Sequence, residues 1–337
     1  MAIRRGVTFY SFQDSYYQGN MNLEDCVRFV SEELHATGVE LMVEQTPISA
    51  DCHNPTDREV DHWKELMAKY GTVPTCMDAF VDTMLYKGRI LTKKEQLQQF
   101  ERDIRVAAKF GFDNIRVLCP LRAEVVEAAV PIAETYGVRM GLEIHQPMHF
   151  GAVWVQRYLD MCARVNSPYV GITPDFGIFM YKPNDIAIRN ALANGGNPRI
   201  IDFIVNEFLK DSTAGQRILP QVQAMGGGPV ECGLVQRYSR LHYNDPEVLR
   251  QYSKYLIHFH AKFYEVDAKT LTETAIDYEN PIRILKEIGW NGSFSSEFEG
   301  QPHYWNDDDL QDTSYELEQL KLHHRMLKNL LGDFDMV

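Results

Sequence analysis

Cysteine is scarce in this sequence, and its spacing suggests no structural role. The 337 residues include six cysteines, and no two of them form a Cys-x-x-Cys pair. Structural zinc sites use such closely spaced pairs, and small secreted domains use dense disulfide frameworks. The pattern predicts neither of these, which favours a reducing compartment.

Long apolar segments are also missing. No apolar run reaches the roughly 18 residues that a transmembrane helix needs. The opening Met-Ala-Ile-Arg-Arg lacks the apolar stretch of a secretory signal. We therefore expect a cytoplasmic protein that binds no membrane.

Basic residues are fewer than acidic residues. Lys and Arg number 34 against 47 Asp and Glu, and the formal net charge is −13. Nucleic acids and anionic membranes bind basic surfaces, so neither is an expected partner. No Gly-x-Gly-x-x-Gly motif follows a strand-like segment, which argues against a dinucleotide-binding fold. Glycine-rich or arginine-rich phosphate cradles are missing near the last two strand-like segments, which disfavours a phosphorylated substrate.

What the sequence has is a regular alternation of strand-like and helix-like segments. Eight short segments are rich in β-branched and aromatic residues, and amphipathic segments with helix-capping residues separate them. This alternation predicts an α/β fold, and a (β/α)₈ TIM barrel fits it better than an open sheet. The predicted strands are residues 6–12, 38–44, 73–80, 114–119, 141–147, 169–175, 256–265 and 292–299.

A long insertion, residues 180–255, separates the sixth and seventh predicted strands. It contains helix-like runs at 198–209 and 245–255 and a glycine-rich turn at 226–229. An insertion of this length after a barrel strand suggests a lid or a docking surface. Its aromatic residues fit that role: Phe203, Phe208, Tyr238 and Tyr243.

The remaining feature is a helix predicted at residues 315–331, which we expect to pack on the barrel wall. Residues 1–337 are therefore interpreted as one barrel domain with the insertion at 180–255 and a C-terminal helix.

The fifth predicted strand carries the first candidate for chemistry. Glu143 and His145 alternate along it and so face the same side. A carboxylate is almost never fully buried unless it is paired or binds a metal. An acid and an imidazole side by side on a buried strand therefore suggest an active site.

Later strands carry similar residues at their carboxyl ends, where barrel enzymes place their active sites. Carboxylates and imidazoles converging there would form a hard ligand set suited to Mn²⁺, Mg²⁺, Co²⁺ or Fe²⁺. Such close like charges would repel one another without a cation. The residues are Asp175 at the end of strand six, His258, His260 and Lys262 along strand seven, and Glu297 and Glu299 near the end of strand eight.

Plainer roles are open for individual residues. A single carboxylate after a strand is most often a helix cap or a loop residue. One of His258 and His260 is expected to be a ligand and the other a satisfied wall histidine. Cys119 has no base beside it in the sequence and is expected to be a small buried residue. Surface or loop positions are expected for His35, His53, His62, His149, His242, His303, His323 and His324.

Four segments together resemble the xylose-isomerase-like barrel superfamily of sugar isomerases and epimerases. They are Gly-Leu-Glu-Ile-His at 141–145, Thr-Pro-Asp-Phe-Gly at 173–177, His-Phe-His-Ala-Lys-Phe-Tyr-Glu at 258–265 and Ser-Ser-Glu-Phe-Glu-Gly at 295–300. The likeness extends from Arg5 to about Gly300. It implies one divalent metal, with Mn²⁺ favoured, held by Glu143, Asp175, His260 and Glu297.

One departure from the superfamily pattern bears on the reaction. The frequent Asp-x-x-His reads Asp175-Phe-Gly-Ile178 here, so a second histidine is lost. This change disfavours simple epimerisation.

A subgroup resemblance narrows the expectation further. The start at 4–13, the His-Ala-Lys-Phe-Tyr-Glu segment at 260–265 and the insertion resemble the larger, catalytic subunits of bacterial C-glycoside deglycosidases. The resemblance implies a 3-oxo-glucosyl C-glycoside as substrate and a small β-rich partner subunit that completes the complex.

The residues suit that chemistry. A ketone at C3 of the sugar acidifies the C2–H bond, and a divalent cation would stabilise the charge that develops. His145 is the expected general base, because imidazole titrates near neutral pH. Lys262, Glu299 and His258 are expected to contact the substrate. β-Elimination would then release the aglycone, which makes the protein a metal-dependent lyase.

Other functions share parts of this reasoning. A ketose epimerase or aldose–ketose isomerase needs the same first proton transfer and is the main alternative. A barrel that binds metal without catalysis, and a metal-dependent endonuclease, fit the residues less well.

Overall fold

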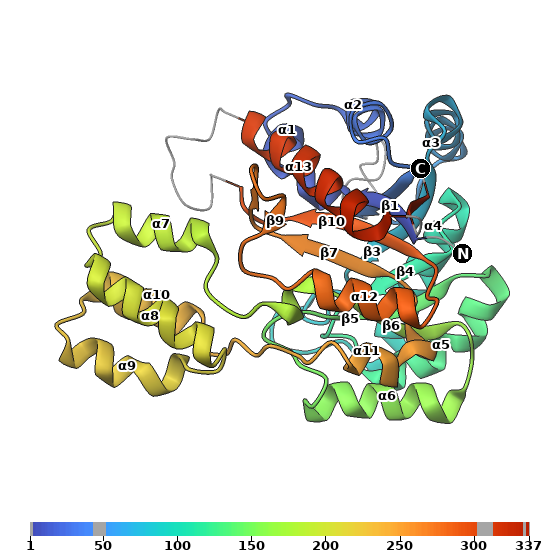
Figure 1. Cartoon of the computed structure of the whole chain (residues 1–337). Coiled ribbons are helices and arrows are strands. Elements are labelled where there is room, and N and C mark those ends of the chain that lie inside the picture. The colour runs from blue at the N-terminus through green and yellow to red at the C-terminus, as the bar shows by residue number, and fades with distance from the viewer. Residues whose placement is uncertain (1–2, 43–51, 302–312, 333–334, 337) are drawn as a thin grey trace.

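The computed structural model describes residues 3–42, 52–301, 313–332 and 335–336. Its main sheet consists of parallel strands in the order β6-β5-β4-β3-β2-β1-β10-β7, so the predicted (β/α)₈ barrel is confirmed (Figure 1). The strands are β1 (Ile3–Thr8), β2 (Gly38–Met42), β3 (Val73–Ala79), β4 (Asn114–Val117), β5 (Arg139–Ile144), β6 (Val170–Pro174), β7 (Phe259–Phe263) and β10 (Ser293–Phe298).

The barrel closes between β6 and β7 through isolated bridges. Ile172 pairs with Leu256 and Asp175 pairs with His260. Gly171 allows this approach, because a Cβ atom there would lie 2.2 Å from the carbonyl oxygen of Tyr255. The closure places two predicted ligands, Asp175 and His260, side by side.

The outer helices begin and end at residues that the sequence marks clearly. Capping boxes start α2, α3 and α4 at Asn22, Thr56 and Thr92. Left-handed glycines end α3 and α4 at Gly71 and Gly111. The helices around the barrel are α1 (Gln13–Tyr17), α2 (Leu23–Arg28), α3 (Asp57–Tyr70), α4 (Lys93–Phe110), α5 (Ala123–Tyr136), α6 (Val153–Val165), α12 (Glu279–Glu287) and α13 (Ser314–Leu331).

The first predicted strand extends beyond the observed one. The first strand was expected at 6–12, but β1 ends at Thr8 and residues Phe9–Phe12 form a 3₁₀ helix. This turn buries Phe9 and Phe12 against each other, with ring centroids 5.5 Å apart. Residues 43 and 44 of the second predicted strand lie outside the described residues.

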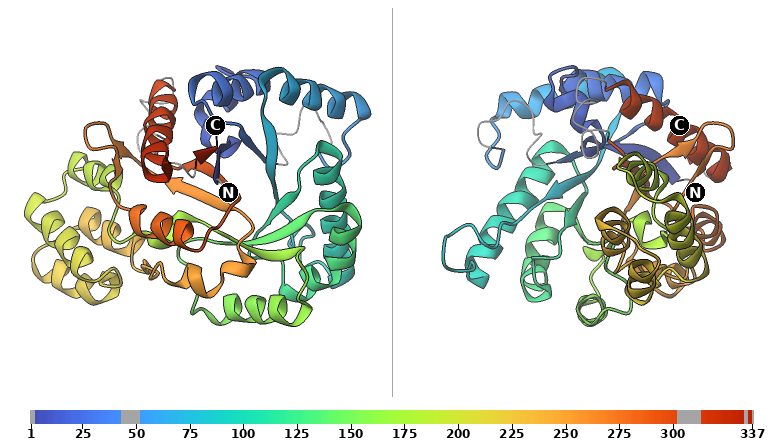
Figure 2. Two further views of the ribbon diagram at one scale, coloured as in Figure 1. Left: turned by 45° about the vertical axis from the view of Figure 1, so that its right-hand side comes forward. Right: turned by 90° about the vertical axis from the view of Figure 1, so that its left-hand side faces the viewer.

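The insertion forms a helical cluster of α7 (Asp185–Ala193), α8 (Pro198–Lys210), α9 (Gly215–Ala224) and α10 (Pro229–Arg237). The cluster lies beside the barrel, on the side toward which the arrows of β7 and β10 point (Figures 1 and 2). That side is the mouth of the barrel. The run at 245–255 is shorter than expected, a single turn of α11 (Val248–Gln251) followed by a 3₁₀ turn (Ser253–Tyr255).

The aromatic residues of the insertion are used differently from the prediction. Phe208 and Tyr238 are buried, with ring centroids 6.4 Å apart. They form the core of the helical cluster itself and are not available to a docking surface, because helices with one apolar face must bury it.

The C-terminal helix α13 packs on the barrel as predicted, but two of its histidines do not lie at the surface. His323 and His324 are 0% and 2% exposed. Both bond to the hydroxyl group of Ser296 on β10. They lie on the buried face of α13, so the prediction of surface positions is wrong for both.

Short strands complete the structure: a hairpin of β8 (Val266–Asp267) and β9 (Thr272–Glu273), and β11 (Asp335–Met336), which pairs with β1. Within the described ranges, no helix combines the length and the apolarity needed to cross a membrane.

Candidate metal centre

Four side chains, carried by β5, β7 and β10 and by the residue after β6, meet in one buried cluster. Glu143, Asp175, His260 and Glu297 are all buried, and each offers a ligand atom within 4.8 Å of the others. The Nδ1 atom of His260 lies 2.9 Å from Oε1 of Glu143 and 3.3 Å from Oε2 of Glu297. The structure thus brings together the set that the sequence resemblance implied.

This cluster has the donor atoms that a divalent cation requires. Asp175 Oδ2 and Glu297 Oε2 are buried and, among the described residues, accept no hydrogen bond, although both lie within ion-pair distance of the ammonium group of Lys262. Three carboxylates and one imidazole nitrogen form a hard, mixed ligand set for a divalent ion. The side chains present therefore fit a divalent metal.

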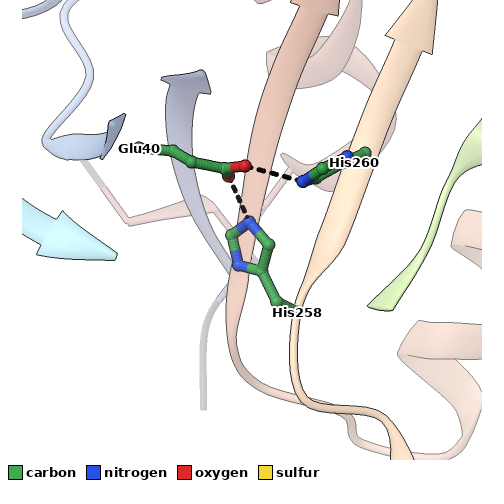
Figure 3. Close-up of side chains that lie close together, drawn as sticks. All are labelled: Glu40, His258 and His260. Carbon is green, nitrogen blue, oxygen red and sulfur yellow. Dashed lines mark hydrogen bonds and ion pairs between the residues drawn. The ribbon is translucent and has the colours of Figure 1, made fainter. Parts of the chain in front are cut away.

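Glu40 on β2 holds the ligand histidine in place. One of its oxygens lies 2.6 Å from Nε2 of His260, and the other lies 2.6 Å from Nε2 of His258 (Figure 3). With Nε2 directed at Glu40, His260 presents Nδ1 to the cluster. His258 lies below it and is completely buried, the position of a wall histidine. The expected contact of His258 with a substrate is therefore not supported, because none of its surface is exposed.

Arg116 on β4 fixes the carboxylate of Glu143. Its Nε lies 2.7 Å from Oδ1 of Asp78, and its Nη1 lies 3.2 Å from Oε2 of Glu143. Burial raises the pKa of Glu143, but the charges of Arg116 and His260 outweigh it and hold the pKa well below its usual range. Glu143 is therefore ionised and oriented, as a metal ligand must be.

Lys262 balances the acids on the other side. Its Nζ lies 2.9 Å from Asp175 Oδ2, 3.3 Å from Glu297 Oε2 and 2.9 Å from Glu299 Oε1. Burial lowers the pKa of Lys262, but Asp175 and Glu297 raise it well above its usual value. Burial also raises the pKa of Asp175 to about 7, although Lys262 opposes that shift. Glu299 is the more accessible of the two, with 28% of its side chain exposed against 10% for Lys262.

His145 was predicted to lie within the fifth strand, at 141–147. The strand β5 ends at Ile144, so His145 is the first residue after it. Its Nδ1 donates a hydrogen bond of 2.7 Å to the carbonyl oxygen of Gln146, which makes Nε2 the basic nitrogen. Gln146 in turn bonds to the carbonyl oxygen of His242 in the insertion, at 2.7 Å. The loop that carries His145 is thus tied to the returning end of the insertion.

Cys119 differs from its prediction. It is exposed, at the end of β4, because the strand stops at Val117 and the chain turns outward. Burial lowers the pKa of His145, but a hydrogen bond with Cys119 and the charge of Glu143 raise it to about 9. A cation in the neighbouring cluster would act in the opposite sense on the imidazole.

Sequence reasoning missed Glu40, Asp78 and Arg116. Each is a charged residue between apolar neighbours in a short buried strand. A charged residue in a buried strand also identified Glu143 as a candidate. The same pattern is present in strands two, three and four.

Comparison with known proteins agrees with the fold. Residues 30–321 match the family described as xylose isomerase-like TIM barrel, and the chain belongs to that family.

The named relatives are sugar-processing enzymes. The chain is 26% identical over 320 residues to a C-glycoside deglycosidase alpha subunit of Arthrobacter globiformis, covering 90% of this chain and 85% of that one. It is 23% identical over 345 residues to a 3'-dehydrocarminate deglycosidase alpha subunit of a Microbacterium species, covering 98% and 96%. A solved D-psicose 3-epimerase has the same fold, with a TM-score of 0.56, 12% identity and coverage of 98% and 100%.

Proposed function

We propose that this protein is the catalytic subunit of a C-glycoside deglycosidase, which cleaves a 3-oxo-glucosyl C-glycoside by β-elimination. The observation that carries the proposal is the position of His145 next to the cluster of Glu143, Asp175, His260 and Glu297. This arrangement suits removal of a proton from the carbon beside a ketone. The names of the relatives from Arthrobacter globiformis and Microbacterium support this reaction.

A divalent cation held by these four side chains, with Mn²⁺ as the first expectation, would polarise the sugar oxygens and stabilise negative charge on the oxygen at C3. Glu40 and Arg116 keep two of the ligands oriented. Lys262 and Glu299 face the substrate hydroxyl groups, and the buried His258 supports Glu40 from below.

The proton transfer falls to His145. Its Nε2 takes the proton from C2, and the electrons of that bond move toward the C3 carbonyl group. The carbonyl group then re-forms while C1 and C2 become doubly bonded. The bond from C1 to the aglycone breaks, and the aglycone carbon keeps the electron pair and takes up a proton. The products are the free aglycone and an unsaturated 3-oxo sugar.

A partner subunit belongs to this proposal, because both relatives are named alpha subunits. The segment after β3 offers a surface for it. Five large apolar side chains there are 46–72% exposed, although soluble proteins rarely gather such residues without a partner: Phe80, Met84, Leu85, Tyr86 and Ile90. We propose that a small β-rich subunit covers this segment at the mouth of the barrel.

The test is an assay of aglycone release from a 3-oxo-C-glucoside, by the chain alone and with its co-purified partner. Release that depends on the metal and increases with the partner supports the proposal. A ketose epimerase is the second candidate, since D-psicose 3-epimerase shares the barrel. Epimerisation of a free ketohexose by the isolated chain, with no aglycone released under any condition, would favour it.

A further inference from the structure

A pocket of about 690 Å³ opens directly beside His145. Its walls come from the segments after β4 and β5, from α6 and from the end of the insertion. Leu121, Met148 and Trp154 give it an apolar side, and Trp154 adds a flat aromatic surface. A volume of this size is in the range of pockets that hold a drug-sized molecule.

The polar side of the pocket is strongly cationic. Arg122, Arg157 and Arg240 line it, together with a single carboxylate, Glu124. All three arginines are exposed, and among the described residues no carboxylate lies within 4.0 Å of their guanidinium groups. They come from three separate segments: the residue before α5, the middle of α6 and the chain after α10. The chain has a net charge of −13, so three arginines without a carboxylate partner around one pocket indicate a site for an anionic ligand.

A second basic pocket on this protein shows the ordinary alternative. Arg102, Arg105 and Lys109 line a hollow on α4. Each of these three has its own acid: Arg102 lies 3.5 Å from Asp103, Arg105 is paired with Glu101, and Lys109 lies 3.0 Å from Asp57. These three cations are already paired with acids of the chain and need no ligand. The arginines of the pocket beside His145 have no such partners among the described residues.

We propose that this pocket binds the aglycone, and that the aglycone is an anionic aromatic group, a carboxylate or phenolate on an aryl ring. The inference depends on the proposed function. His145 lines the pocket, and it follows the ligand Glu143 by two residues at the end of β5, so it connects the pocket to the metal cluster. The proton leaves C2, and C1 beside it carries the aglycone. A sugar bound at the cluster therefore directs its aglycone past His145 toward Trp154 and the three arginines.

Each part of the pocket suits one part of such a group. The aryl ring would lie against Trp154 and Met148, where ring stacking and contact with a polarisable sulfur are favourable. The guanidinium groups would receive the anionic oxygens through charge-assisted hydrogen bonds. A neutral aglycone could use the apolar wall but would leave the arginines unpaired.

The experiment compares 6-hydroxy-2-naphthoate with its methyl ester as fluorescent probes of direct binding. Wild-type protein should bind the acid at least about tenfold more tightly than the ester at low salt, and added salt should weaken binding of the acid alone. A triple variant, Arg122→Gln, Arg157→Gln and Arg240→Gln, should bind both compounds with affinities within about twofold. A matched triple variant at exposed arginines far from the pocket, Arg58→Gln, Arg199→Gln and Arg325→Gln, should keep the preference.

Equal binding of acid and ester by the wild type, or a preference that survives in the pocket variant, would overturn the inference. Turnover is measured separately on 3-oxo-C-glucosides that carry either aryl group. Release of neither aglycone would count against the proposed function, while the binding comparison would still decide whether the pocket selects aromatic anions.

Discussion

The Nε2 atom of His260 lies 2.6 Å from a carboxylate oxygen of Glu40. Glu40 belongs to β2 and His260 to β7, so the contact spans the interior of the barrel and directs Nδ1 of His260 toward Glu143 and Glu297. A carboxylate behind a ligand histidine fixes its tautomer and raises its basicity. The orientation of His260 in the metal centre therefore depends on Glu40.

Replacing Glu40 should therefore weaken metal binding without removing a ligand. Glu40→Gln is expected to lower the affinity for Mn²⁺ by about 10- to 100-fold, the usual cost of losing such a partner. Titration calorimetry measures the change. Glu24→Gln, the same substitution on the exposed side of α2, serves as the control and should have no effect. An unchanged affinity in the Glu40 variant would show that His260 needs no such support.

Replacing His145 should remove catalysis and leave the metal. His145→Ala is expected to lose about 10²–10⁴ in kcat, the typical contribution of a general base. Cys119→Ala removes a neighbour of the imidazole and should change kcat only a few-fold. Steady-state kinetics and elemental analysis measure both effects. Near-normal kcat would transfer the role of base to Lys262, and loss of metal would make His145 a ligand.

Removing the metal should destabilise the fold. A cation that binds only the folded chain adds about 2.7 kcal/mol at 100 times its Kd. Mn²⁺ added to chelator-treated protein should therefore raise Tm by several degrees in scanning calorimetry. Glu297→Gln should abolish most of that rise, since it removes one ligand and its charge. If Mn²⁺ does not change the Tm of the wild-type protein, the proposal that the cluster binds a divalent cation is wrong.

His324 should make the protein sensitive to acid. Burial, aided by the charge of Arg5, lowers the pKa of His324 to about 3. The unfolded chain, with a value near 6.5, binds more protons below that pH, so stability is complete above pH 6.5 and falls toward pH 3. At pH 5 the loss from His324 is about 2 kcal/mol.

Urea unfolding at pH 7 and pH 5 measures this loss. His324→Gln should reduce the difference between the two pH values, whereas His62→Gln on α3 should not. An equal acid effect in wild type and His324→Gln would mean that other groups account for it.

The partner should depend on the apolar segment after β3. Leu85→Glu with Ile90→Glu is expected to abolish co-purification of the small subunit and leave the Tm of the isolated chain unchanged, because both side chains are exposed. Leu209→Glu, at an equally exposed position in the insertion, is the control. Retention of the partner by the double variant would move its docking site elsewhere.

Much of the fold was predictable because local signals agreed with one another. Thr92 and Gly111 mark the ends of α4 in the sequence as they do in the structure. The proximity of Asp175 and Glu297 could be predicted from the sequence, since carboxylates at the carboxyl ends of parallel strands meet at the same mouth of the barrel.

Other features depend on tertiary contacts that periodicity does not carry. His323 and His324 look like polar helix residues, and only the packing of α13 on β10 shows that they are buried. Phe9–Phe12 has strand-forming residues but folds as a 3₁₀ turn around its own ring contact. The three arginines beside His145 come from segments far apart in the chain, so no sequence spacing could have joined them.

The most direct test of the central claim is an NMR experiment in D₂O on a 3-oxo-C-glucoside with the metal-loaded complex. The account predicts free aglycone and an unsaturated 3-oxo sugar, formed together and lost together in His145→Ala. Inversion at C2 with the bond to the aglycone intact, and no free aglycone, would contradict carbon–carbon cleavage and make the protein an epimerase.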